Sequence, residues 1–161
     1  MAGTDVSHPP SAPAQRQPAT VNYAHGMSLP RTIARWLLGT GLVFAGIGHL
    51  TFARGAFAAQ VPHWLPLPVD VVVLASGIVE IALGLALALL ARYRVAIGWI
   101  TAAFFVAVFP GNVEQFVRGT DAFGLDSDLA RGVRLLFQPL LVIWALWSTG
   151  AWRALRERRR R

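Results

Sequence analysis

A glutamate in the middle of a long apolar segment constrains this chain more than any other feature. Residues 69–90 read VDVVVLASGIVEIALGLALALL and contain two charged side chains, Asp70 and Glu80. About 20 apolar residues suffice to cross a bilayer, so this segment predicts a transmembrane helix. Asp70 falls in the first turn, where the helix dipole favours a carboxylate. Glu80 falls near the centre of the span, where a charge costs about 3 kcal/mol or more, so we expect it to face protein and mark a site.

Small residues surround Glu80 on its own face of the predicted helix. Ser76, Gly77 and Gly84 lie four and three residues before it and four residues after it. Small side chains let a second helix approach closely, so this face is expected to pack on another helix. Glu80 could instead be a packing residue without chemistry. That alternative stays open, although a buried carboxylate stabilises a fold poorly compared with an apolar side chain.

The composition places the whole chain among membrane proteins. Of 161 residues, 55% are hydrophobic and 14% are charged, with a mean hydropathy of +0.49; soluble domains carry about 25% charged residues. The absence of cysteine excludes disulfides, thiol catalysis and cysteine-ligated metal sites. All 15 cationic side chains are arginines, and the net charge is +7. They gather at predicted helix ends and at the C-terminus, which indicates membrane topology, and no nucleic-acid partner is expected.

The predicted fold class is all-α, an integral membrane four-helix transmembrane bundle with an interfacial segment between the first two spans. Three prolines interrupt that segment, residues 53–68, and prevent a continuous helix. The third span is short and is expected to continue past Pro110, with residues 110–112 kinking or ending it near the far surface. Pro139 is expected to kink the fourth span. The four spans are expected at about residues 32–52, 69–90, 95–109 and 128–150.

Three parts follow along the chain. Residues 1–30 are rich in proline and are expected to form a disordered tail, with Met27 serving as a start as well as Met1. Residues 31–150 form the transmembrane domain, and Arg31 and Arg35 are expected to anchor its beginning at the interface. Residues 151–161 form an Arg-rich tail that favours anionic lipid. The positive-inside rule places both termini in the cytoplasm, with the protein in the cell membrane.

Five polar residues fall at related depths in the four spans. A helical rise of about 1.5 Å per residue places His49, Asn112 and Arg134 in the outer third of the membrane. Gln138 lies about one turn deeper, and Glu80 lies near the midplane. In a compact bundle they would line one pocket that opens outward and ends on Glu80. Arg134 would reach the carboxylate directly or through Gln138. For His49, an interfacial anchor is an equal alternative.

Standard catalytic signatures are missing from the sequence. It contains no Gly-rich phosphate loop, HExxH motif or nucleophile elbow. Haem held by two histidines would need His49 and His63 to face each other from a helix end and a loop, and His63 suits a wet interfacial place better. A single His, a single Glu and a single Asn make a weak set of metal ligands. No metal is predicted, haem is not favoured, and whether the chain is an enzyme stays open.

Several short motifs resemble the DoxX family of small four-span membrane proteins. They are, in order, GIGHLTF, VPHWLPLP, SGIVEIALGLAL, AVFPGN and RLLFQPLLVIWAL, and the likeness covers about residues 33–149. The family takes its name from a subunit of an archaeal terminal-oxidase or thiosulfate:quinone oxidoreductase system, and some actinobacterial relatives are linked to an oxidoreductase complex for oxidative stress. The missing cysteine argues against a thiol relay here. The family's recurrent polar positions map onto His49, Glu80, Asn112, Arg134 and Gln138.

The sequence leaves three functions open. In the first, the chain is a quinone- or lipophile-binding subunit of a membrane oxidoreductase system, in which Glu80 carries a proton and His49, Asn112, Arg134 and Gln138 bind ligand oxygens. In the second, it is a non-catalytic scaffold that recruits soluble redox or stress-response partners. The third, a small transporter, is favoured least, because four spans without an inverted repeat would need to oligomerise. Membrane lipid is an expected partner, and a homo-oligomer stays open.

Overall fold

The computed structural model describes residues 28–121, 124 and 127–160, and every regular element in them is helical. Four helices are long and apolar enough to cross a membrane, which confirms the predicted fold class. The tail before residue 28 lies outside the described residues. The elements are α1 (Leu29–Leu50), α2 (Arg54–Ala58), α3 (Val69–Leu89), η1 (Ala91–Tyr93), α4 (Arg94–Arg118), α5 (Asp128–Thr149) and α6 (Ala151–Arg158).

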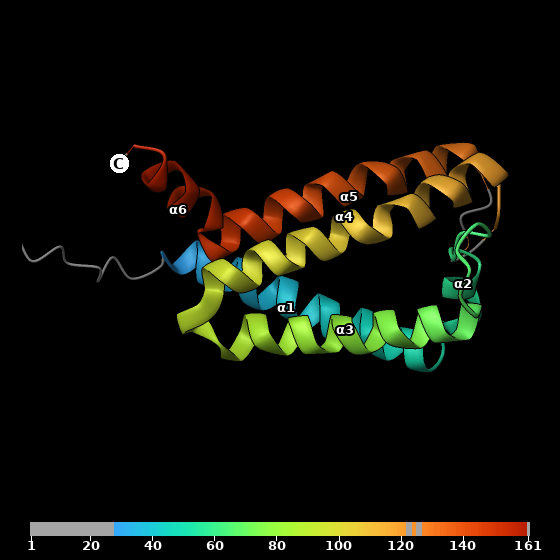
Figure 1. Cartoon of the computed structure of the whole chain (residues 1–161), viewed down its shortest axis with the longest axis horizontal. Coiled ribbons are helices and arrows are strands. Elements are labelled where there is room, and N and C mark those ends of the chain that lie inside the picture. The colour runs from blue at the N-terminus through green and yellow to red at the C-terminus, as the bar shows by residue number, and fades with distance from the viewer. Residues whose placement is uncertain (1–27, 122–123, 125–126, 161) are drawn as a thin grey trace, which may run out of the picture.

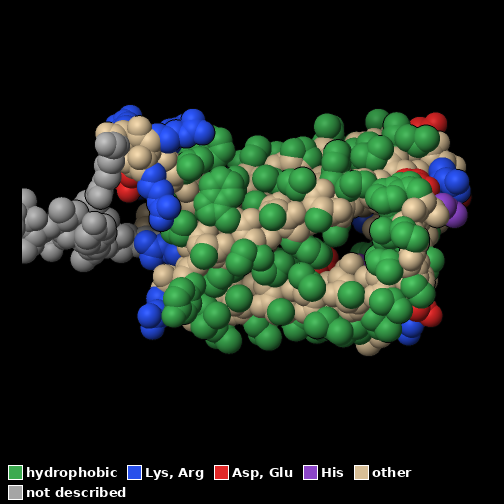
Figure 2. All heavy atoms as spheres, viewed as in Figure 1, with side chains coloured by type: hydrophobic (Ala, Val, Ile, Leu, Met, Phe, Trp, Pro, Cys, Tyr) green, Lys and Arg blue, Asp and Glu red, His purple; other side chains and the backbone are tan. Residues whose placement is uncertain are grey.

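The four long helices run along one axis and give the bundle two different ends. The start of α1, η1 and α6 lie together at one end, called here the arginine end, and α2 lies at the other, called the loop end (Figure 1). Blue arginine atoms gather at the arginine end in Figure 2, and apolar side chains cover the long flank between the two ends. Large apolar residues on every long helix are exposed, as lipid-facing surfaces require; examples are Phe44, Ile78, Val106 and Phe137.

Glycines bring α1 and α3 into direct backbone contact. Gly46 opposes Gly77, and Gly39 opposes Gly84, so that the two antiparallel helices meet at both levels. A Cβ added at Gly46 would lie 2.5 Å from the Gly77 carbonyl oxygen, and one added at Gly84 would lie 2.5 Å from the Gly39 carbonyl oxygen. The small-residue face around Glu80 therefore packs on α1, as the sequence predicts.

The other helix pair, α4 and α5, has a proline inside each helix. The third span was expected to continue past Pro110, and α4 does so as far as Arg118, where Gly119 ends it with a φ of 64°. Pro110 has no amide hydrogen to donate to the Val106 carbonyl. Gln138 of α5 donates to the adjacent Phe105 carbonyl, and this bond joins α4 to α5. Helix α5 begins as expected, because the Ser127 side chain accepts a hydrogen bond from the Ala130 amide.

Arg35 is not the interfacial anchor that the sequence predicts. Only 4% of its surface is exposed, and its guanidinium donates to the carbonyls of Leu87 and Ala88 at the end of α3. The last carbonyls of a helix have no donor within the helix and attract a cation, so Arg35 completes the hydrogen bonding of α3 from the neighbouring α1. Arg31, one turn earlier, lies over the ring of Trp147, with 5.8 Å between its Cζ and the ring centroid.

The segment that joins α2 to α3 crosses to α4 at the loop end. The Gln60 side chain donates to Gln115 Oε1 at 3.2 Å, and the Gln60 carbonyl abuts Gly111, which has no space for a side chain. His63 contacts Glu114 Oε1 through both its amide and Nδ1, each at 3.2 Å, and its ring is largely exposed, as expected for a wet position. These contacts hold the segment across the gap between the α1/α3 pair and the α4/α5 pair.

Candidate functional site

A cavity of about 570 Å³ extends from the segment after α2 into the bundle, a volume within the range of small-molecule sites. Figure 2 shows a hollow between α3, α4 and this segment, with red and blue side-chain atoms inside it. The charged residues that line the cavity are Glu80 and Arg134. The structure brings together all the polar residues that the sequence singled out: His49, Glu80, Asn112, Arg134 and Gln138.

His49 and Glu80 form a close polar pair in the cavity. His49 Nδ1 lies 2.9 Å from Glu80 Oε2 and 3.0 Å from the Ala45 carbonyl oxygen, and about one tenth of each of the two side chains is exposed. A carbonyl oxygen can only accept, so Nδ1 carries a hydrogen and donates it to Ala45. With this hydrogen on Nδ1, Nε2 of a neutral imidazole would be an acceptor.

This arrangement leaves the Glu80 carboxylate incompletely bonded. The Nδ1–H bond is directed at Ala45, so the 2.9 Å contact between Nδ1 and Oε2 lies away from the N–H axis. Oε2 is buried and has no hydrogen-bond partner among the described residues. A buried acceptor without a donor costs free energy comparable to a lost hydrogen bond, and a ligand hydroxyl reaching the cavity would supply that donor.

An amide pair lines the cavity beside them. Gln138 Nε2 donates to the Phe105 carbonyl at 2.6 Å, so Gln138 Oε1 points the other way and accepts from Asn112 Nδ2 at 3.0 Å. Because Nδ2 of Asn112 is committed to this bond, the amide pair is fixed between α4 and α5. The predicted link from Arg134 to Glu80, direct or through Gln138, stays a prediction.

Sequence reasoning gave no role at the site to Phe57. Its ring stacks on His49 with 3.4 Å between the ring centroids and 15° between the planes, and both rings line the cavity. This stack fixes the plane of the imidazole. Phe57 is the aromatic residue of α2, and the sequence showed it only as part of an apolar, proline-interrupted segment. Its partner could not be inferred, because the stack depends on how α2 folds back over α1.

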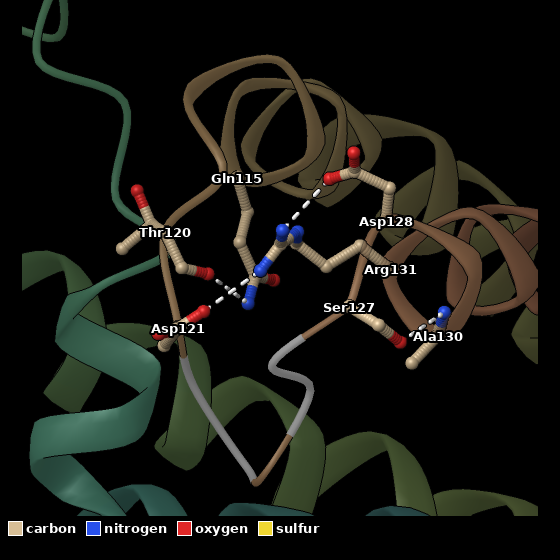
Figure 3. A network of polar contacts seen from close by, with 7 residues as sticks. All are labelled: Gln115, Thr120, Asp121, Ser127, Asp128, Ala130 and Arg131. Carbon is tan, nitrogen blue, oxygen red and sulfur yellow. Dashed lines mark hydrogen bonds and ion pairs between the residues drawn. The ribbon is translucent and has the colours of Figure 1, made fainter.

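Two arginines one turn apart on α5 have different surroundings. Arg134 lines the cavity, while Arg131 binds Asp121 and Asp128, with 2.7 Å between each pair of atoms (Figure 3). Gln115 donates to the Thr120 carbonyl in the same network. Arg131 therefore fastens the connection between α4 and α5 and does not contribute to the cavity. Among the described residues, no group of three His, Asp or Glu side chains could hold a metal ion.

Replacing Gln138 with leucine is expected to destabilise the fold by about 1–2 kcal/mol, because Asn112 would lose its acceptor in a buried place and the Phe105 carbonyl its side-chain donor. Thermal unfolding of the purified protein in a mild detergent measures the loss. Gln60→Leu is the control, since Gln60 makes a single, partly buried bond at the loop end. Equal losses in both variants would contradict the importance of the amide pair.

Comparison with known proteins gives one match. A family model described as "Domain of unknown function (DUF8561)" matches residues 38–149, which include every polar residue of the cavity named above. No curated protein and no solved structure matches the chain. Because neither result names the DoxX family, the resemblance to that family stays a prediction.

Proposed function

The chain belongs to the family defined by the domain of unknown function DUF8561, and we propose that this member binds a lipophilic molecule with a polar head group inside the membrane. A quinone is the ligand class that suits the cavity best. In this proposal the protein is a subunit of a membrane oxidoreductase system, in line with the resemblance to the DoxX family.

One observation carries the proposal: a buried oxygen of Glu80, which has no hydrogen-bond partner among the described residues, faces a cavity at membrane depth whose lining is mostly apolar and aromatic. Intramembrane carboxylates are costly and commonly mark ligand or proton pathways. Glu80 is next to a histidine whose Nε2 can accept a further hydrogen bond, and Arg134 adds donors. A single cavity thus offers both acceptors and donors to a polar head group.

The hydrogen-bond donors and acceptors of the cavity match the two redox states of a quinone. The carbonyl oxygens of the oxidised head accept hydrogen bonds, which Arg134 would donate. The hydroxyls of the reduced head donate hydrogen bonds, which Glu80 Oε2 and His49 Nε2 would accept. Reduction of a quinone to a quinol takes up two electrons and two protons. A partner redox protein would supply the two electrons, and Glu80 would pass on the two protons from water, one after the other.

The charge distribution supports a multi-pass protein of the cell membrane with both termini in the cytoplasm. Among the described residues, the ion pairs that involve arginine all lie at the loop end, where acidic side chains offset Arg54, Arg118 and Arg131. The arginine end carries the excess of cations, and such an excess marks the cytoplasmic side. Two reporters fused after Arg161 test this orientation. A reporter that works only in the cytoplasm should be active, and one that works only outside the cytoplasm should be inactive.

Binding of a short-chain quinone to protein in lipid nanodiscs tests the function directly. We expect saturable binding at one quinone per chain and an about tenfold or greater loss of affinity in Arg134→Leu, since a hydrogen bond to a charged group contributes about 1.5–3 kcal/mol. Arg118→Leu, an exposed change at the loop end, should bind as the original protein does. Absence of saturable binding, or equal losses in the two variants, would refute the proposal.

A further inference from the structure

The cavity has a polar part and an apolar part, and the two lie at different levels of the bundle. The polar residues lie between the depth of Glu80 and the loop end of the bundle. Toward the arginine end, α3 contributes no lining residue beyond Glu80, but α1 and α5 continue the wall. On α5 the lining runs from Arg134 to Trp144, ten residues or about 15 Å along the helix.

The apolar part, called here the α1/α5 strip, consists of Leu37, Leu38, Gly41 and Leu42 of α1 with Leu141 and Trp144 of α5. Leu38 and Leu42 are buried and form its floor. Leu37 and Trp144 are 59% and 36% exposed, so the strip faces the surroundings of the bundle. At its far end Trp144 Nε1 donates to the Ala34 carbonyl at 3.0 Å, which ties α5 to α1.

Gly41 keeps the strip open. It lines the cavity and is exposed, and no atom lies within 4 Å of where its Cβ would be. It therefore differs from Gly39 and Gly46 of the same helix, whose missing side chains are required for contact with α3. A glycine inside a helix costs about 1 kcal/mol relative to alanine, and at Gly41 no helix contact requires it. The empty volume beside it is available to a ligand.

We propose that the α1/α5 strip seats the hydrocarbon chain of a single-chain amphiphile whose polar head lies against Glu80, His49 and Arg134. This inference rests on the proposed function and narrows its ligand to molecules with one long chain, such as an isoprenoid or alkyl quinone. Lipid solvates the hydrocarbon chain as well as leucine does, so the affinity gained at the strip comes from van der Waals packing and not from hydrophobic transfer. Its effect is to fix the direction of the molecule, with the head held toward the buried carboxylate.

A second way out of the cavity exists between α3 and α4, where the exposed Ala107 belongs to the lining. This opening lies at the level of the polar residues, beside Ser76 and Val108, and corresponds to the hollow seen in Figure 2. A hydrocarbon chain that left the cavity here would enter the lipid directly, without contacting the α1/α5 strip. The two sides are distinguished by one small residue each, Gly41 and Ala107, and each residue has room for a substitution.

The test compares a decyl-chain quinone with the same head group lacking the chain, for protein in lipid nanodiscs. We expect Gly41→Leu to weaken binding of the decyl quinone about tenfold or more, to the level of the chainless head, and to leave the chainless head unchanged. Ala103→Leu, an exposed change on α4 outside the cavity lining, is the control and should change neither. Ala107→Leu, on the other side of the cavity, should not weaken the decyl quinone more than the chainless head. Circular dichroism and size-exclusion profiles check that the three variants fold.

The outcomes separate the chain seat from the proposed function. Selective loss in Ala107→Leu, unchanged binding in Gly41→Leu, or equal binding of the two quinones by the original protein would each overturn the seat while the head site stands. If neither quinone binds the original protein, both proposals fail. A photoreactive group at the chain end provides a test without substitutions: adducts are expected within 37–42 and 141–144, and adducts within 76–80 or 107–108 would overturn the seat.

Discussion

Leucine at Gly46 is expected to separate α1 from α3 and to lower the free energy of unfolding by about 3 kcal/mol or more. The first added carbon would lie 2.5 Å from the Gly77 carbonyl oxygen, 2.7 Å from Ile81 Cγ1 and 3.0 Å from the Ile81 amide nitrogen. Two of these atoms are backbone and cannot turn aside, so the helices must move apart, a larger change than ordinary overpacking of a core. Thermal unfolding in a mild detergent, with size-exclusion chromatography, measures the effect.

Gly41→Leu is the matched control for this prediction, because Gly41 lies on the same helix in open space. It should unfold at or above the temperature of the original protein. Gly77→Leu should be as harmful as Gly46→Leu, since the two glycines face each other, and the double variant should lose less than the sum because both changes disrupt one contact. A Gly46→Leu protein that unfolds like Gly41→Leu would refute the close approach of α1 and α3.

Most of the bundle could be predicted from the sequence because bilayer thickness fixes helix length. The second span was expected at residues 69–90 and α3 occupies Val69–Leu89, and the fourth was expected to begin near Asp128, where α5 begins. The polar residues could be placed by the same means. Rise per residue and alternating chain direction determine the depth of Glu80 or Gln138, and residues at similar depth in a four-helix bundle face one cavity.

The features that could not be predicted depend on contacts between helices. Apolar length alone cannot show that α4 runs on to Arg118, because Glu114 in its last turns is bound by His63, which belongs to another segment. Arg35 has the position of an interfacial anchor in the sequence, and only the end of α3 beside it makes burial favourable. The stack of Phe57 on His49 likewise depends on the path of the connection between α1 and α3.

Glu80→Gln is expected to lower the affinity for quinol about tenfold or more while the bundle stays folded. Quinone-dependent turnover of the assembled system should fall as well. Glutamine has the same shape, but its neutral amide replaces the charged acceptor and does not take up or release a proton. Hydrogen bonds to charged groups contribute about 1.5–3 kcal/mol. Removing a buried charge relieves its desolvation, so the unfolding temperature should hold or rise. Quinol titration, proton uptake on quinol binding and thermal unfolding measure the three effects separately.

Asp70→Asn makes the same chemical change at the loop end of the same helix, where the carboxylate is exposed and paired with Arg54, and it should leave affinity, proton uptake and turnover unchanged. The rival interpretation, a scaffold in which Glu80 only locks helices together, predicts the reverse pattern. In a scaffold, Glu80→Gln would unfold at a lower temperature, and quinol affinity and turnover would not respond. The two readings therefore differ in the sign of the stability change as well as in binding, because a carboxylate held for packing loses a contact on neutralisation, whereas one held for a ligand loses its cost of burial.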